Sequence, residues 1–475
     1  MSRYIKWLIA TINISVLVGC GGGGGGGTPT YPTATFTEVP NALSITYPTG
    51  TSSVVAVVPI DINSDGKDDL VVHYLGSTSW ALNVGNVEAI NKLKIYIQQT
   101  DGAFADQTTT YLEGDDTLGG WSRKAKIVDV NGDGKKDVIY AINQEDGRVA
   151  NTPSDMNAQI AMLVSNGTKY TVKKFGDNNW YHSVGFGIDS LNQMFVTGAG
   201  YTTNTVIQHT VSNNTLLASS LDINLSPNAF EFFNSTGTSS WTNLLLQASN
   251  SLDYLGVDGF SQSTDGTWNR LSSLKFSQAS FPVTQVSYNG DTAPWVAYQL
   301  GDKYVSFAGI TETCQIKLVP GGENVIVFAL SGSLIPNFQS GMTVELNKLQ
   351  TYRVSKAAKI SNGQIIEVPL NINDEQTNNM NANFFDCKDV NADGYADIVV
   401  YPYTSTGLPH VYLNNKNSGF NYIGTAQFPE VQQVDKAWTS ILHDFDGDGI
   451  KDLMVYPSTA TSTKWRYYKG QKNLQ

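Results

Sequence analysis

The chain has 475 residues, a formal net charge of −12 at pH 7 and charged residues at only 15% of its positions. This composition favours short strands and turns over long surface helices, which need many Lys, Glu and Arg. An acidic chain without a stripe of Lys and Arg is a poor partner for nucleic acid, whose phosphates must be neutralised by basic groups. Clustered carboxylates suit hard cations instead.

The first residues predict export and attachment to a membrane. Arg3 and Lys6 precede a mostly apolar stretch, residues 7–18, which is too short and too polar for a membrane span. It ends in Leu17-Val18-Gly19-Cys20, which resembles a bacterial lipobox. That resemblance implies that Cys20 carries lipid; an ordinary signal peptide with an incidental cysteine is the alternative.

Residues 1–19 are therefore expected to be a lipoprotein signal peptide. Residues 20–35, which contain an unbroken glycine run and then Thr and Pro, are expected to be a flexible lipid-anchored tether. Position 21 is Gly rather than Asp, so the resemblance to bacterial lipoproteins favours the outer membrane of the cell envelope. The body would then be periplasmic or surface-exposed.

Four segments share the pattern Asp-x-Asn/Asp-x-Asp-Gly-x-x-Asp, and chance does not explain four matches with identical spacing. They are residues 61–69, 129–137, 389–397 and 444–452. Calcium takes six to eight oxygen ligands at loosely constrained angles. A tight loop presents the side chains at positions 1, 3 and 5 toward one centre, Gly at position 6 permits the turn, and the Asp at position 9 closes the cage.

The pattern therefore predicts about four Ca²⁺ sites, in which the ligands are four side chains and the main-chain carbonyl at position 7. The fourth segment has one more carboxylate than the others, so it is expected to bind most tightly. The predicted ligands are Asp61, Asn63, Asp65, Lys67 and Asp69; Asp129, Asn131, Asp133, Lys135 and Asp137; Asp389, Asn391, Asp393, Tyr395 and Asp397; and Asp444, Asp446, Asp448, Ile450 and Asp452.

The flanks of these segments argue against an EF-hand, which needs a glutamate at position 12 and a helix on either side. Position 12 is Val72, Tyr140, Val400 and Val455, and short β-branched and aromatic runs surround each segment. Each motif is expected to be strand, loop, strand. Downstream, residues 94–104, 158–170 and 411–420 predict a third strand, a turn with Gly and a fourth strand.

These residues resemble the FG-GAP/VCBS repeat family, which includes integrin-like propellers and many bacterial surface proteins. The resemblance implies an all-β fold for residues 36–475: a β-propeller of four-stranded blades, seven in number with eight as the alternative. Blades in the middle of the chain would have kept their strands and lost the metal. Residues 310–383 do not fit one regular blade and are expected to hold an extra blade or an insertion. The segment from Phe36 to Tyr47 is expected to pair with the last strand and close the ring.

Two further groups of residues leave alternatives open. Cys314 and Cys387 either form a disulfide or remain buried free thiols. Four tryptophans precede the first strands of blades at a similar repeat phase, and form either a ligand face or ordinary core between blades. They are Trp121, Trp180, Trp241 and Trp438.

The sequence contains no motif for a catalytic triad, a zinc protease or a phosphate loop, so no catalytic residue is predicted. The favoured function is a calcium-binding envelope module for binding or adhesion, in contact with the membrane through its lipid and with a polysaccharide or surface protein. The alternatives are a polysaccharide-active, lyase-like enzyme on a propeller scaffold and a structural scaffold of an envelope assembly.

Overall fold

The computed structural model describes residues 36–474, apart from 44, 77–90, 119–120, 144–159, 176–181, 189–192, 200–203, 213–214, 222–229, 235–242, 251–254, 278–279, 289–290, 346–347, 373–380, 404–406, 426, 430–437 and 458–464. The expected all-β fold is confirmed. Within the described residues, α1 (Thr108–Tyr111) is a single turn of α-helix and the other regular elements are strands. No helix in this part of the chain is long and apolar enough to span a membrane. The expected signal peptide, Cys20 and the tether lie outside the described residues.

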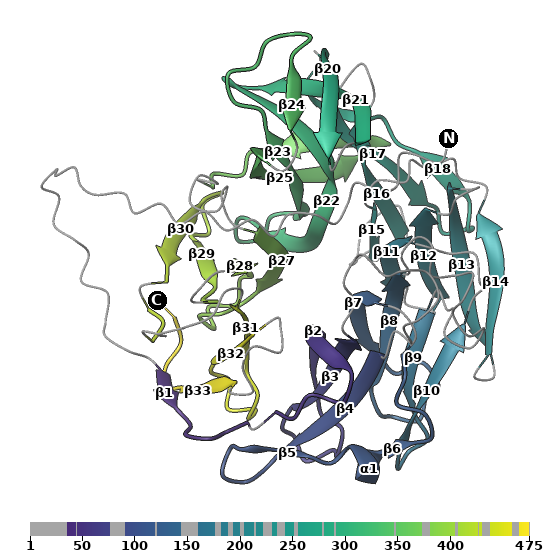
Figure 1. Ribbon diagram of the computed structural model, residues 1–475, viewed down its shortest axis with the longest axis vertical. Coiled ribbons are helices and arrows are strands. Elements are labelled where there is room, and N and C mark those ends of the chain that lie inside the picture. The colour runs from purple at the N-terminus through teal and green to yellow at the C-terminus, as the bar shows by residue number, and fades with distance from the viewer. Residues whose placement is uncertain are drawn as a thin grey trace, which may run out of the picture.

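The described strands form seven sheets, which we number in chain order (Figure 1). The first sheet contains β2 (Thr51–Ile60), β3 (Asp69–Gly76), β4 (Asn91–Gln98) and β5 (Phe104–Asp106). The second contains β6 (Leu112–Glu113), β7 (Trp121–Val128), β8 (Asp137–Asn143), β9 (Ile160–Ser165) and β10 (Tyr170–Phe175). The third contains β11 (His182–Ile188), β12 (Gln193–Ala199), β13 (Asn204–Ser212) and β14 (Thr215–Leu221).

The fourth sheet contains β15 (Phe230–Asn234), β16 (Asn243–Asn250), β17 (Leu255–Gln262), β18 (Trp268–Arg270) and β19 (Leu274–Ser277). The fifth contains β20 (Ser280–Tyr288), β21 (Asp291–Leu300), β22 (Lys303–Lys317), β23 (Asn324–Leu334), β24 (Thr343–Glu345), β25 (Gln350–Ser361) and β26 (Gln364–Val368). The sixth contains β27 (Asn381–Lys388), β28 (Asp397–Tyr403), β29 (His410–Asn414) and β30 (Phe420–Gly424). The seventh contains β31 (Trp438–His443), β32 (Asp452–Pro457), β33 (Arg466–Gly470) and β1 (Phe36–Glu38).

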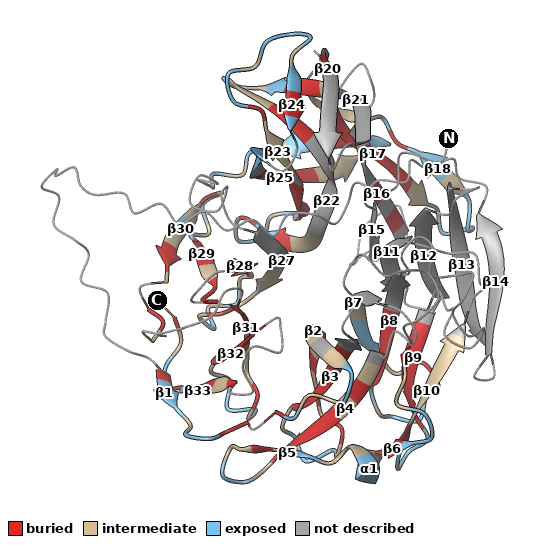
Figure 2. Cartoon of the chain, in the orientation of Figure 1, coloured by how far each residue is buried: buried red, intermediate tan, exposed pale blue. Residues whose placement is uncertain are grey.

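The strands that follow the four acidic segments, β3, β8, β28 and β32, are mostly apolar because both of their faces are covered. In β3, Leu70 and Val72 pack in one core cluster with Met454 of the seventh sheet, whereas Val71 packs in another with Val138 of the second sheet. Figure 2 shows buried residues, in red, along strands such as β3. Each such strand therefore joins its own sheet to both neighbours.

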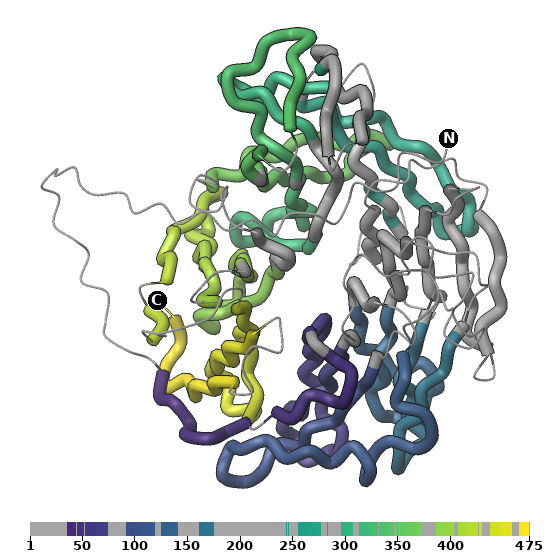
Figure 3. The backbone as a smooth tube through the Cα atoms, viewed as in Figure 1, coloured from purple at the N-terminus to yellow at the C-terminus, as the bar shows by residue number. Residues whose placement is uncertain are grey.

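The sheets follow one another around the molecule in chain order, so the last lies beside the first (Figure 1). As predicted, the two ends of the chain complete one sheet: β1 pairs antiparallel with β33, with Phe36 opposite Gly470. Phe36 is 7% exposed and stacks on Phe428, with the ring centroids 5.5 Å apart. Figure 3 shows the first and last described segments side by side.

The region from 310 to 383 belongs mainly to the fifth sheet, which has seven strands. Its strands β22 and β23 are unusually long, and both are followed by further strands on the same sheet rather than by a separate unit. Cys314 of β22 and Cys387 of β27 form a disulfide with a Cα–Cα separation of 5.8 Å. This bond connects the fifth sheet to the sixth.

Candidate metal centres

The four acidic loops occupy the same place in four sheets, between a strand at the edge of the sheet and the strand next to it. The first connects β2 to β3, the second β7 to β8, the third β27 to β28 and the fourth β31 to β32. Strands flank every loop, so the strand–loop–strand prediction is confirmed and the EF-hand is excluded.

Two positions in each loop have left-handed backbone. At position 6, Gly66, Gly134, Gly394 and Gly449 have φ between 85° and 87°, a conformation that only glycine adopts without strain. Position 4 is also left-handed, with φ of 62° at Ser64 and 58° at Ala392. The sequence pattern predicted the first of these turns and missed the second.

The side chains at positions 1, 3 and 5 of each loop turn their oxygens toward the loop's own N–H groups. In the third loop, Asp389 accepts hydrogen bonds from the N–H groups of Asp393 (3.0 Å) and Gly394 (2.8 Å). Asp393 in turn accepts one from the N–H of Tyr395 at 3.0 Å. The same bond to the position-6 glycine recurs in the other three loops. This wrapping gathers side-chain oxygens on one small turn, which is the donor chemistry that calcium requires.

The aspartate at position 9 does more than close the loop. All four of these side chains have no exposed surface. In the first loop Asp69 accepts hydrogen bonds from the N–H of Ile62, at position 2 (2.9 Å), and from the N–H of Gln98 on the third strand (2.8 Å). We call this arrangement the clamp. It recurs in the other loops, where the N–H groups of Ser165, Asn414 and Gly470 donate to Asp137, Asp397 and Asp452.

Burial raises the pKa of each clamp aspartate to about 6, and the hydrogen bonds from the two main-chain N–H groups partly offset that shift. The carboxylates are therefore mostly ionised at neutral pH, in surroundings that disfavour the charge. A cation nearby would stabilise the ionised form.

The fourth loop has the closest grouping of carboxylates. One carboxylate oxygen from each of Asp444, Asp446 and Asp452 lies within 4.8 Å of the others, the one such group in the described part of the chain. The Oδ1 atom of Asp444 is buried and has no hydrogen-bond partner among the described residues. Three converging carboxylates, one of which has a buried oxygen without a hydrogen-bond partner, fit a calcium ion.

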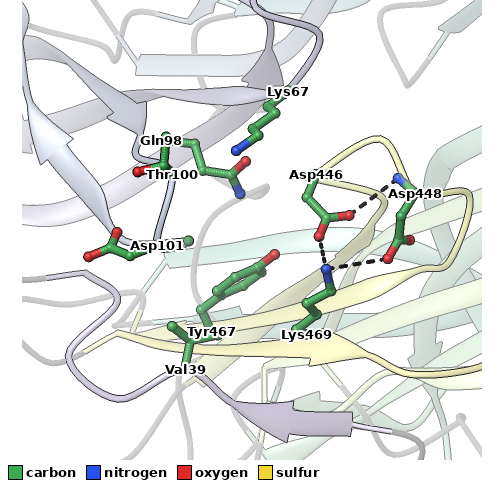
Figure 4. A pocket seen from close by; sticks show the side chains of 10 residues that line it. Val39, Lys67, Gln98, Thr100, Asp101, Asp446, Asp448, Tyr467 and Lys469 are labelled. Carbon is green, nitrogen blue, oxygen red and sulfur yellow. Dashed lines mark hydrogen bonds and ion pairs between the residues drawn. The ribbon is translucent and has the colours of Figure 1, made fainter.

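A lysine side chain pairs with the carboxylates that an ion in this loop would need. The Lys469 ammonium forms an ion pair with Asp446 and lies 3.4 Å from Oδ2 of Asp448 (Figure 4). The hydrogen bond to Asp446 raises the pKa of Lys469. Sequence reasoning missed this residue, because it lies on β33, far beyond the loop in the chain.

The third, fourth, first and second loops lie in the sixth, seventh, first and second sheets, which follow one another around the molecule. The fourth contacts the first, since the N–H of Asp68 donates to the carbonyl of Phe445 at 2.8 Å. A side chain at Gly447 would place its Cβ 2.9 Å from the Gly66 carbonyl oxygen, so this contact requires glycine. The first contacts the second through Lys135 Nζ and the Ile62 carbonyl, 3.3 Å apart.

The tryptophan ligand face is wrong for Trp438, which is 4% exposed and packs in the core between the sixth and seventh sheets. Its large apolar ring is buried there, as the alternative interpretation expected. Trp121 begins β7, but its side chain is not among those described. Trp180 and Trp241 lie outside the described residues.

Residues 389–455 match a family model described as an FG-GAP-like repeat. The match begins at position 1 of the third loop and ends within β32, so it includes the whole fourth loop. This segment is an FG-GAP-like repeat. The resemblance expected from the sequence is confirmed there, and the repeat unit runs from one acidic loop through the strands to the next.

No curated protein sequence matches this chain. Among solved structures, it is similar to the exotype rhamnogalacturonan lyase YesX, with 14% identity, a TM-score of 0.39 and coverage of 92% of this chain and 76% of that one. It is also similar to the Bacillus licheniformis rhamnogalacturonan lyase PL11, with 12% identity, a TM-score of 0.42 and the same coverages. A β-1,3-galactosidase, BT0265, has 9% identity, a TM-score of 0.30 and coverage of 89% and 95%.

Proposed function

We propose that this chain is a calcium-binding β-propeller of seven blades, anchored by a lipid on Cys20 in the bacterial cell envelope, where it acts as a binding or adhesion module. The observation that supports it best is the presence of four acidic loops at the same place in consecutive sheets. Each sheet would be one blade, and the ions would be structural.

The chain's own oxygens provide for the ion. In each loop the side chains at positions 1, 3 and 5 and the carbonyl at position 7 would hold calcium, and the clamp aspartate would contribute an oxygen lone pair that its N–H donors leave free. Because each loop joins two strands and contacts the next sheet, an ion held there would stabilise the connection between blades as well as the hairpin.

Removing calcium should therefore lower the melting temperature. An ion that binds only the folded form stabilises it by about 2.7 kcal/mol per site when its concentration is 100 times Kd. We expect the melting temperature in 1 mM calcium to exceed that in EDTA by several degrees, measured by scanning calorimetry at constant ionic strength.

Substitutions test whether the calcium-dependent gain in melting temperature comes from the acidic loops. Asp444→Asn should reduce the calcium-dependent gain, because it removes one of the converging carboxylates. Asp302→Asn changes an exposed aspartate in the β21–β22 hairpin, outside all four loops, and should leave the gain intact. Equal melting temperatures with calcium and with EDTA would refute the structural role of the metal.

A further inference from the structure

A cavity of about 340 Å³ lies where the two ends of the chain meet. Its walls come from the first sheet and its loop on one side and from β33 and the fourth loop on the other (Figure 4). This volume is near the lower limit for small-molecule sites, about 300–1,000 Å³. The cavity therefore suits a small ligand or the end of a longer one.

Gln98 gives this cavity its chemical character. It is 3% exposed, and neither Oε1 nor Nε2 has a hydrogen-bond partner among the described residues. The clamp fixes its position, since its own N–H donates to Asp69. In Figure 4 the amide points into the space between Lys67 and Tyr467. Burying an amide without partners is unfavourable, so this side chain is expected to be paired in the working state of the protein.

The other polar groups limit the ligand. Lys67 and Lys469 bring ammonium groups to the wall, while Asp101, Asp446 and Asp448 bring carboxylates. Lys469 is paired with Asp446 and Asp448, and each of these groups keeps further hydrogen-bonding capacity. A strongly charged ligand of either sign would meet like charges here. A neutral ligand with adjacent hydroxyl groups would meet both donors and acceptors, and an amide can donate to one hydroxyl and accept from the next.

We propose that this cavity binds a neutral sugar residue, with Gln98 as its central hydrogen-bonding group. The inference rests on the proposed binding function and gives it a ligand class and a place. Tyr467 forms a fixed wall, because its hydroxyl donates to the clamp aspartate Asp452 at 2.9 Å. Asp446 and Asp448 belong both to this cavity and to the fourth loop, so the site is next to a proposed calcium ion.

The test uses the purified full-length protein with methyl glycosides of glucose, galactose and mannose as probes, and methyl galacturonoside as the charged comparison. Saturation-transfer NMR identifies the binding probe, and calorimetric titration measures its affinity. Gln98→Met keeps the size of the side chain and removes both hydrogen-bonding atoms. We expect it to weaken sugar binding by about tenfold or more, equivalent to loss of hydrogen bonds worth about 1.4 kcal/mol.

Gln99→Met is the matched control. Gln99 is the next residue, its amide donates to the Ile97 carbonyl at 2.9 Å, and it does not line the cavity. It should leave sugar affinity unchanged. The melting temperature of Gln98→Met should be unchanged or higher than that of the unmodified protein, because an unpaired buried amide is removed.

Three results would overturn the inference. They are failure of every neutral glycoside to bind, equal sugar affinity in Gln98→Met and the unmodified protein, and a marked loss of stability in Gln98→Met without ligand. The last would show that the amide has a structural partner. None of them affects the calcium-dependent melting that tests the proposed function, so the two ideas fail separately.

Discussion

Each clamp aspartate does two things with one carboxylate. It accepts main-chain hydrogen bonds that connect the loop to the third strand, and its remaining lone pairs would be available to an ion bound in the loop. In the fourth loop this carboxylate also accepts the Tyr467 hydroxyl, which makes Asp452 the most heavily bonded of the four. A residue so constrained holds its position whether or not an ion is near.

Lys469 would oppose ion binding in the fourth loop, because its ammonium pairs with carboxylates that an ion would need. Lys469→Met should raise the calcium affinity of the fourth loop by up to about fivefold, since an exposed ion pair contributes about 0.2–1 kcal/mol. Calorimetric titration of calcium into metal-free protein measures this.

Lys472→Met is the charge-matched control, because Lys472 is exposed and lies three residues further along the chain. If both variants gain affinity equally, the effect comes from net charge and the competition between Lys469 and calcium is refuted.

The unit that repeats at the scale of elements is a strand, an acidic loop and a strand, joined by the clamp to a third strand. Substitutions in the clamp and in the loop should therefore have different effects on stability and on calcium affinity. In EDTA, Asp397→Asn should lower the free energy of unfolding by about 1–3 kcal/mol, because an amide nitrogen would face a buried N–H donor. Urea denaturation measures this difference.

Asp389→Asn is the comparison within the same loop. Its hydrogen bonds lie near the surface, and asparagine keeps one acceptor oxygen, so the metal-free protein should lose little stability. It should instead lose calcium affinity. Equal destabilisation by both substitutions in EDTA would contradict the clamp.

The local parts of this unit could be predicted from the sequence. The spacing of Asp389, Asp393 and Gly394 predicts a tight turn whose side chains face one centre. The apolar runs on either side predict strands. The clamp could not be predicted, because the N–H that completes it comes from Asn414 and depends on strand register. The sequence also left open whether Trp438 is buried, since its repeat phase is the same whether its ring faces solvent or a neighbouring sheet.

For the whole molecule, the acidic loops are grouped on both sides of the junction between the last and first sheets. The acidic loops lie in the sixth, seventh, first and second sheets, and the Cys314–Cys387 disulfide joins the fifth to the sixth. The cavity at Gln98 lies at the same junction. Sequence reasoning placed the loops near each end of the chain, and the closed order of the sheets makes them neighbours.

The disulfide should stabilise the ring independently of calcium. Its cysteines are 73 residues apart, and breaking such a bond typically costs about 2–4 kcal/mol. Replacing both Cys314 and Cys387 by serine should lower the urea midpoint by a similar amount with calcium and with EDTA. An unchanged midpoint, or two free thiols in the unmodified protein by mass spectrometry, would contradict this.

The pairing of β1 with β33 also determines how the molecule responds to mechanical load. Any pull applied through the chain before Phe36 enters the body through β1, which is three residues long and lies at the edge of its sheet. Such a strand can be peeled from its partner one hydrogen bond at a time. An ion in the fourth loop would not reinforce it directly, since its ligands lie between β31 and β32. We therefore expect a load on the chain before Phe36 to act first on the shortest strand of the seventh sheet.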